Sequence, residues 1–253
     1  MAELPRPARR ISMKRTLFPS LLLMIVLPLV ARGGSLADRW VTGLKEVDQK
    51  LRAQQWEEAR KQAREVAGEI VDDAGRNKDA GYTLAVTSVF RAIAEAGLGR
   101  QDDADWYWDL ALNLVPGIGK TNLSPYGDAV AGLKGRTLRG SRPPVEPGEL
   151  WTEDGRKVPR GKVEPPRILR QVRPEYPEKL NHAGVPGRVI VETILGADGR
   201  PRSPRVLEMQ GGGHAMKYAA LDALGQWRFE PAKLEGQPVA VFYTLTINFK
   251  IGR

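Results

Sequence analysis

Apolar and polar residues alternate along the last stretch of the chain. From Val239 to Ile251 every second residue is apolar, and polar side chains such as Thr244, Thr246 and Asn248 lie between them. This period of two predicts a half-buried strand that is longer than the usual strand of roughly 5–6 residues. A strand at a sheet edge is either protected or used to capture another strand, and this segment alone leaves both alternatives open.

Residues 38–116 show a different period. Apolar residues recur every three or four positions among strong helix formers, which predicts helices. A looser copy of one pattern surrounds Trp56, so we expect two repeat-like hairpins and a capping helix over 124–135, in a helical module of residues 38–135. Such hairpins form either a peptide-binding groove or a compact spacer. The clearer copy has the spacing of a tetratricopeptide repeat, with packing positions at Ala92, Gly99, Ala104, Trp108, Ala111 and Pro116.

Residues 136–165 are predicted to be a linker. Eight of the nineteen prolines lie between Pro143 and Pro177. A stretch this rich in proline and this poor in apolar residues cannot build a core of its own. We therefore expect an extended tether between two modules.

Residues 166–253 are predicted to form a small domain of mixed helices and strands. The fold class of the whole chain is therefore α+β, with all-α hairpins, the linker and a small antiparallel sheet that has two helices on one face. In chain order the domain has a short helix from Pro177, strands over 188–195 and 205–209 with a turn at 197–199, a helix over 214–227, a strand from Arg228, a turn at 235–236 and the terminal strand.

Residues 1–37 have the pattern of an export signal. Lys14 and Arg15 precede an apolar run of about fifteen residues, and the small residues Ser35 and Ala37 mark a cleavage site. Because a membrane-spanning helix needs roughly 20 apolar residues, we expect cleavage after Ala37 and a periplasmic or cell-envelope protein. An uncleaved segment would anchor the chain in the inner membrane. The true start, at Met1 or Met13, stays open.

Composition argues against several classes of function. The chain has no cysteine, and its two histidines, His182 and His214, have no histidine partner at helical spacing, so we expect no metal site, no cofactor and no thiol nucleophile. More than half of the net charge of +9 lies in residues 1–37, and no dense basic run follows, so nucleic-acid binding is not expected. The acidic pairs are adjacent in sequence and do not face each other on a helix, so no enzyme is expected.

Several short motifs of the C-terminal region occur in the order and at the spacing of a known family. The residues that carry the match are Tyr176, Pro177, Gly187, Asp198, Gly199, Trp227, Phe229 and Pro231. With them, residues 166–253 resemble the TonB C-terminal domain of bacterial energy transducers. The resemblance implies an antiparallel sheet of three or four strands with helices on one face. It also implies a function, the capture of an extended peptide of an outer-membrane transporter on an edge strand.

Carried onto this chain, the resemblance implies a recognition edge near the start of the terminal strand. Strand addition needs only main-chain hydrogen bonds, which agrees with the lack of catalytic groups there. The alternative is an internal or dimer-forming strand, and a homodimer by strand exchange stays open. The residues of the predicted edge are Pro238, Val239, Ala240, Val241, Phe242, Tyr243 and Thr244.

The N-terminal half departs from the family. Its transducers usually contact an inner-membrane motor, ExbB and ExbD, through a membrane helix that carries a polar histidine. Here the apolar run is short and has no histidine, and a helical module stands where the family has its spacer. We therefore expect either a TonB-like energy transducer for outer-membrane transport, or a soluble periplasmic scaffold that uses the same domain without a motor.

Overall fold

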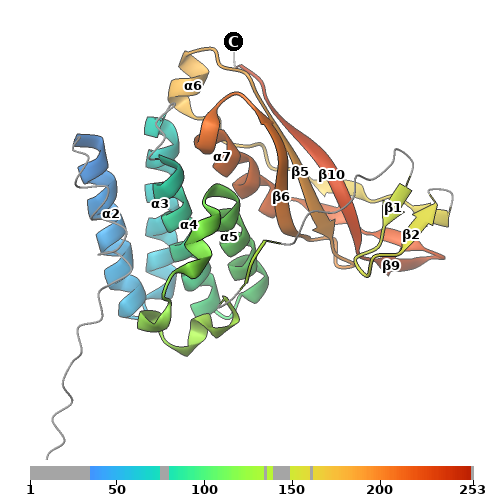
Figure 1. The fold of residues 1–253 in the computed structure, drawn as a ribbon, viewed down its shortest axis with the longest axis horizontal. Coiled ribbons are helices and arrows are strands. Elements are labelled where there is room, and N and C mark those ends of the chain that lie inside the picture. Colours follow the sequence, from blue (N-terminus) through green and yellow to red (C-terminus); the bar gives the residue numbers. More distant parts are fainter. Residues whose placement is uncertain (1–34, 75–79, 134–135, 139–148, 160–161, 252–253) are drawn as a thin grey trace, which may run out of the picture.

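The computed structural model describes residues 35–74, 80–133, 136–138, 149–159 and 162–251 of the chain. A block of long helices lies beside a twisted antiparallel sheet, and helix α7 (Gly213–Gly225) lies between the two (Figure 1). The predicted export signal falls almost entirely within residues 1–34, outside the described residues. In the described part of the chain, no helix combines the length and the apolar character needed to cross a membrane.

The helical module consists of two antiparallel hairpins, as predicted. Three-residue turns join the helices of each hairpin. Alanines lie where the helices cross, and Ala59, Ala63, Ala92 and Ala104 are completely buried, so the backbones can approach closely. The helices are α2 (Ser35–Arg52), α3 (Trp56–Ala74), α4 (Ala80–Gly97) and α5 (Gln101–Leu114).

The predicted repeat positions lie in the second hairpin and just after it. Ala92, Ala104, Trp108 and Ala111 are buried between α4 and α5. Gly99 ends the turn after α4 with a φ of +73°, and Pro116 opens the 3₁₀ helix η1 (Pro116–Lys120) directly after α5. Hairpin geometry therefore agrees with the spacing, while membership of the tetratricopeptide repeats stays a prediction.

The predicted capping helix is present only as two short turns. Over 124–135 the chain forms the 3₁₀ helices η2 (Ser124–Tyr126) and η3 (Asp128–Leu133). The hydroxyl of Tyr126 donates to the Asp48 carboxylate at 2.5 Å, and its ring contacts Phe90 edge-on. These turns close one side of the helical core as expected, but without a regular α-helix.

The C-terminal sheet has three strands in the order β10-β5-β6. They are β5 (Gly187–Leu195), β6 (Pro201–Gln210) and β10 (Val241–Phe249), and all neighbours are antiparallel. Helix α7 packs on one face, and the short α6 (Glu178–His182) precedes β5. The antiparallel sheet, the helix on its face and the hairpin turn at 197–199 agree with the sequence prediction, whereas α6 contacts α3 of the helical module and the predicted strand from Arg228 pairs outside this sheet.

The predicted terminal strand is divided at Ala240. Its first part, β9 (Gln237–Val239), pairs with β8 (Ala232–Leu234) across the turn at Glu235 and Gly236, where both residues have positive φ. Its second part, β10, pairs with β5 along its whole length. The strand is interrupted because the chain changes partner from β8 to β5 at this point.

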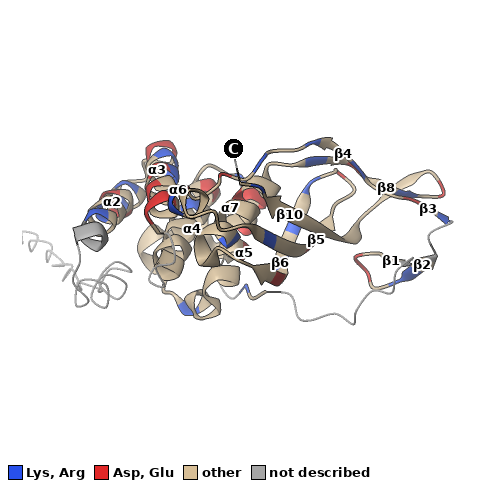
Figure 2. Ribbon diagram, turned by 90° about the horizontal axis from the view of Figure 1, so that it is seen from above, with Lys and Arg blue, Asp and Glu red and all other residues tan. Residues whose placement is uncertain are grey.

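The proline-rich linker is not an extended tether in its described part. Strands β1 (Glu149–Trp151) and β2 (Lys157–Pro159) form a hairpin, and β3 (Val163–Glu164) pairs with β8. Farther on, β4 (Arg167–Arg170) pairs with β7 (Arg228–Glu230). Main-chain hydrogen bonds at strand edges need few apolar side chains, so the segment is ordered despite its composition. Strands β1, β2 and β3 lie at the end of the molecule farthest from α2 (Figure 2).

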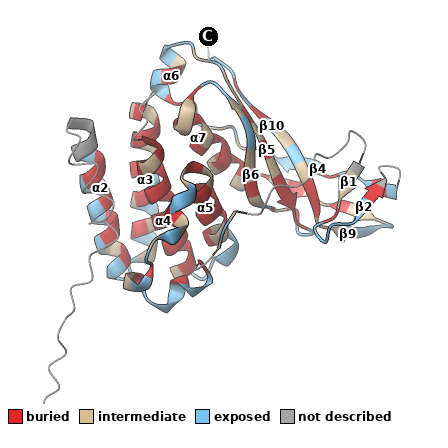
Figure 3. Ribbon diagram, in the orientation of Figure 1, coloured by how far each residue is buried: buried red, intermediate tan, exposed pale blue. Residues whose placement is uncertain are grey.

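One apolar core extends from the helices into the C-terminal domain. Buried residues cover the facing sides of α4, α5 and α7 (Figure 3). The indole nitrogen of Trp106 donates to the carbonyl of Leu221 at 3.2 Å. Gly225 makes this approach possible, because a Cβ there would lie 2.4 Å from the same indole nitrogen. The two modules therefore form one packed body.

A buried ion pair lies at the centre of this interface. The Arg91 side chain of α4 donates to the Asp222 carboxylate of α7 at 2.5 Å and to the Tyr218 hydroxyl at 3.1 Å. It also donates to the Tyr107 hydroxyl, and its guanidinium carbon lies 3.7 Å from the centre of the Tyr107 ring. Burial raises the pKa of Tyr218 to about 12, and burial followed by the Asp222 charge raises the pKa of Tyr107. Both hydroxyls therefore stay neutral.

Replacing Arg91 with alanine should destabilise the whole chain. The substitution removes the charged partner of the Asp222 carboxylate, whose side chain is 20% exposed, so the loss should lie at or below the cost of breaking a fully buried pair, about 3–5 kcal/mol. Urea unfolding should show this loss. The control is Arg156→Ala in the β1–β2 turn, where Arg156 is 66% exposed and pairs with exposed Asp154, so the unfolding midpoint should not move. Equal midpoints for the two variants would contradict the role of Arg91.

Candidate functional site

The edge of the sheet formed by β6 is covered by the helical module. The side-chain amide of Asn113, at the end of α5, donates to the carbonyl of Pro204 at 2.7 Å. Its oxygen accepts from the main-chain nitrogen of Val206 at 2.9 Å. The amide thus makes the pair of hydrogen bonds that a neighbouring strand would make, so the β6 edge is already partnered at this point.

The β10 edge is covered only at its beginning. Thr152, after β1, forms an isolated bridge with Val241, and the main-chain nitrogen of Glu153 donates to the carbonyl of Ala240 at 2.9 Å. Among the described residues, no further strand pairs with β10 on the side away from β5. The segment from Thr244 to Asn248 is therefore an exposed strand edge.

The register shows which main-chain groups of β10 point outward. The Ala240 carbonyl points away from β5, toward Glu153. Main-chain groups of successive strand residues point to opposite sides, so those of Thr244, Thr246 and Asn248 also point outward. Groups of Val241, Tyr243 and Leu245 point toward β5. Thr244, Thr246 and Asn248 thus have both exposed side chains and outward main-chain groups.

A cleft lies beside the C-terminal half of this edge. It has a volume of about 500 Å³ and lies between residues 246–250 and the segment 171–176, with Trp227 beneath. Tyr176 packs edge-on against Phe249, with 5.5 Å between ring centres, and the Trp227 indole donates to the Val172 carbonyl at 2.8 Å. The cleft therefore has fixed aromatic walls next to the outward main-chain groups.

The predicted recognition edge over 238–244 overlaps the exposed edge only in part. Pro238 and Val239 belong to β9, where they pair with Lys233 and Ala232. Ala240 and Val241 contact the β1–β2 hairpin. Thr244 is the predicted residue that lies on the exposed part. The exposed part of the β10 edge thus begins where the predicted segment ends. Sequence alone gave no sign of the division at Ala240 or of the β1–β2 hairpin.

The other predicted motif residues shape the scaffold. Gly199 has a φ of +74°, and a Cβ there would lie 2.0 Å from the Phe229 carbonyl oxygen. Gly187 leaves room for the sulfur of Met216. The Asp198 carboxylate accepts from the main-chain nitrogen of Arg200 and fixes the hairpin turn. Buried Pro177 starts α6, and Pro231 follows β7, so of this set Tyr176 and Trp227 line the cleft.

Sequence reasoning missed the residues that decide which edge is open. Asn113 covers β6, and Thr152 with Glu153 covers the start of β10. No local pattern marks them, since each acts on a strand that is distant in sequence. In the described part of the chain there is also no group of three metal-ligating side chains.

Comparison with known proteins identifies the C-terminal domain. Residues 172–251 match the family model described as the Gram-negative bacterial TonB protein C-terminal. Protein TonB of Vibrio cholerae serotype O1 is 36% identical over 87 residues, which are 34% of this chain and 35% of that protein. The chain thus spans about a third of the length of this curated relative. A solution structure of the Pseudomonas aeruginosa TonB C-terminal domain is 31% identical, covers 36% of this chain and 89% of that chain, and has a TM-score of 0.31.

The resemblance predicted from the sequence is therefore confirmed for the C-terminal domain. The matched family and relative are TonB proteins and not enzymes, in agreement with the expectation that the chain has no enzymatic activity. The match begins at residue 172, so the helical module and the strands β1 to β4 lie outside it.

Proline at two adjacent positions of β10 should differ greatly in its effect on stability. Leu245→Pro removes a donor to β5 and should destabilise the chain by at least about 2 kcal/mol. Thr246→Pro removes an outward donor, which edge strands tolerate, and should leave a cooperative transition near that of the wild type. Urea unfolding of both variants measures the difference. A larger loss for Thr246→Pro would show that the outward direction is assigned to the wrong residues.

Proposed function

We propose that this chain is a TonB-like cell-envelope protein whose C-terminal domain binds an extended peptide of an outer-membrane transporter. The peptide adds as a further strand to the exposed edge of β10, from Thr244 to Asn248. The observation that carries the proposal is this unpaired edge within a domain that matches the TonB C-terminal family. We further propose that binding serves energy-coupled transport, through an ExbB/ExbD-type motor in the inner membrane.

Strand addition suits the chemistry of this edge. Main-chain hydrogen bonds supply affinity, and pockets for alternate side chains supply specificity. The outward main-chain groups of Thr244, Thr246 and Asn248 can make the hydrogen bonds, and the cleft beside Phe249 can receive a peptide side chain. Tyr176 and Phe249 hold each other in place through their edge-on contact, so this wall of the cleft needs little ordering when a peptide binds.

A soluble periplasmic scaffold is the second candidate function. The observation that favours it is the packing of the C-terminal domain against the helical module in one core, which gives the domain no long reach of its own. The same β10 edge would then bind peptides of envelope proteins without a motor. Fractionation and intact mass of the native protein distinguish the two functions. An intact chain in the inner membrane supports energy transduction, and a processed chain in the soluble periplasm supports the scaffold.

Peptide binding should depend on one main-chain donor. The probes are synthetic peptides with the N-terminal segments of the outer-membrane transporters of the source organism, titrated into the full-length chain. We expect Thr246→Pro to weaken binding at least about tenfold, equivalent to about 1.4 kcal/mol or one hydrogen bond. Thr246→Ala keeps the main-chain donor and should bind like the wild type.

The location of binding has a separate readout. Amide NMR signals of Thr244, Thr246 and Asn248 should shift in the wild type when peptide is added. Unchanged affinity in folded Thr246→Pro, with shifts elsewhere on the domain, would refute the proposed edge.

A further inference from the structure

A small arginine-rich pocket lies between the helical module and the C-terminal domain. It has a volume of about 230 Å³. Residues of α3 and α4 line one side, and residues at the end of α7 and the start of β7 line the other. Two carboxylates, Glu95 and Asp103, also line it. The arginines are Arg60, Arg64, Arg91, Arg100, Arg170 and Arg228.

Half of these arginines have their charge balanced within the protein. Arg91 pairs with Asp222 at 2.5 Å. Arg100 pairs with Glu95 at 3.4 Å, and Arg60 pairs with Glu57 on its own helix. Their positive charges are therefore largely used in holding the fold.

The other three arginines have no such partner. In the described residues, no carboxylate lies within ion-pair distance of Arg64, Arg170 or Arg228. Arg64 comes from α3, Arg170 from β4 and Arg228 from β7, so both modules contribute. The exposed basic residues of β4 are visible in Figure 2.

Arg228 is held in place although its charge is unfavourable there. Its Nη1 donates to the carbonyls of Trp227 at 2.6 Å and Gly225 at 3.2 Å, which fixes the guanidinium at the end of α7. Burial and then the charge of Arg200 lower the pKa of Arg228, with a smaller effect from Arg170, while the carboxylates of Asp103 and Asp198 act in the opposite direction. A guanidinium that is fixed near other guanidinium groups is preorganised to bind an anion.

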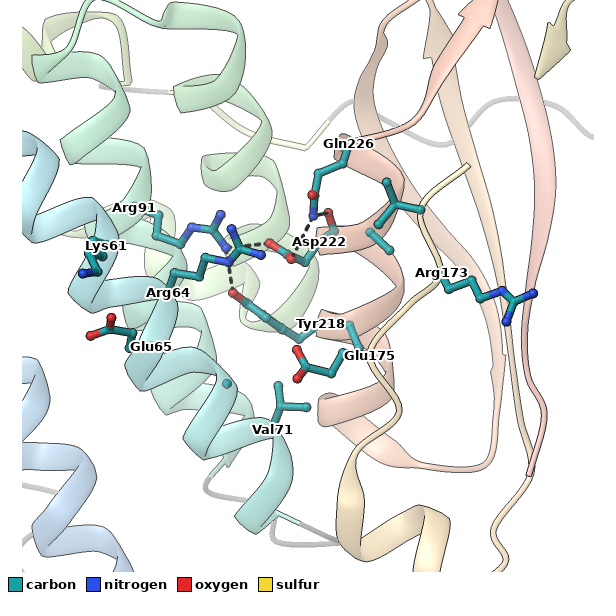
Figure 4. Close-up of a pocket in the computed structure, with 14 residues that line it drawn as sticks. Lys61, Arg64, Glu65, Val71, Arg91, Arg173, Glu175, Tyr218, Asp222 and Gln226 are labelled. Atoms are coloured by element: carbon teal, nitrogen blue, oxygen red, sulfur yellow. Dashed lines mark hydrogen bonds and ion pairs between the residues drawn. The ribbon is translucent and has the colours of Figure 1, made fainter. Parts of the chain in front are cut away.

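A second observation comes from Arg91. Its Nε is buried and has no hydrogen-bond partner among the described residues, whereas Nη1 donates to Tyr218 and Asp222 and Nη2 donates to Tyr107. Arg91 and Arg64 also line a larger cleft of about 510 Å³ that adjoins the pocket (Figure 4). In Figure 4 both side chains extend toward α7, with Asp222 and Tyr218 facing them.

We infer that this pocket binds a doubly charged oxoanion of the phosphate class. Three unbalanced guanidinium groups from two modules need more than the single charge of a carboxylate to be neutralised. Guanidinium forks bind phosphate oxygens in pairs, which matches the number and type of donors present. The adjoining cleft offers room for an organic group attached to the phosphate. The bound anion would link α3 to β4 and β7 and hold the two modules together.

Phosphate affinity of the full-length chain tests the site. Inorganic phosphate, titrated by calorimetry at low ionic strength, should bind the wild type and bind Arg64→Ala and Arg170→Ala at least tenfold more weakly. The matched control is Arg167→Ala. Arg167 lies on the same strand as Arg170 and is also exposed, but it does not line the pocket, so its loss should change the affinity less than twofold.

Further measurements distinguish a specific phosphate site from nonspecific electrostatic attraction. Acetate, with one charge, should bind at least tenfold more weakly than phosphate. Arg228→Lys keeps the charge but loses the fork, and should weaken phosphate binding while the thermal unfolding temperature without ligand stays near that of the wild type. A comparison of glycerol 3-phosphate with inorganic phosphate shows which kind of ligand the site takes. Tighter binding of the ester supports a phosphorylated compound, and equal binding supports free phosphate.

Three results would overturn the inference. They are no phosphate binding at millimolar concentration, equal weakening by Arg167→Ala and Arg170→Ala, or acetate binding as tight as that of phosphate. None of these results bears on peptide binding at β10, which uses a different edge of the domain.

Discussion

The ion pair between Arg91 and Asp222 is the contact on which the arrangement of this molecule depends. It is formed between α4 and α7, one in each module, and two neutral tyrosine hydroxyls also accept hydrogen bonds from the guanidinium. The Arg91 side chain is only 6% exposed, so a displacement of α7 would leave its charge without the Asp222 carboxylate in a largely buried place. The pair therefore fixes the orientation of α7, and through α7 that of the sheet. The helices and the sheet should accordingly unfold as one cooperative unit.

This fixed orientation determines which edge of the sheet is available. With α7 docked, the end of α5 reaches β6, and the amide of Asn113 occupies that edge. The opposite edge, β10, is closed by the β1–β2 hairpin at Val241 and then left exposed. A three-stranded sheet with two equivalent edges could pair with copies of itself, whereas one exposed edge of limited length restricts what can be added. The helical module thus influences which edge of the sheet stays exposed.

Local chemistry was predictable from the sequence, and long-range contact was not. Alternating residues predicted β10, Asp198 and Gly199 predicted the hairpin turn, and the alanine spacing predicted the helical hairpins, since each depends on neighbours in the chain. By contrast, Arg91 lies between Phe90 and Ala92 in an apolar helix, and nothing nearby shows that its partner is more than a hundred residues away. The proline-rich linker was misjudged for a related reason. Its composition rules out a core of its own, but strand pairing with β8 requires only the main chain of a distant segment.

The full-length pairing of β10 with β5 has a mechanical consequence. Hydrogen bonds between antiparallel strands run perpendicular to the strand axis. A peptide added along β10 and pulled along its own length would therefore load all of its hydrogen bonds in shear at the same time, and the load would pass to β5 through nine paired residues. Pulled sideways from one end, the same peptide would lose its bonds one after another. A sheet of this geometry thus resists tension along its strands far better than tension across them.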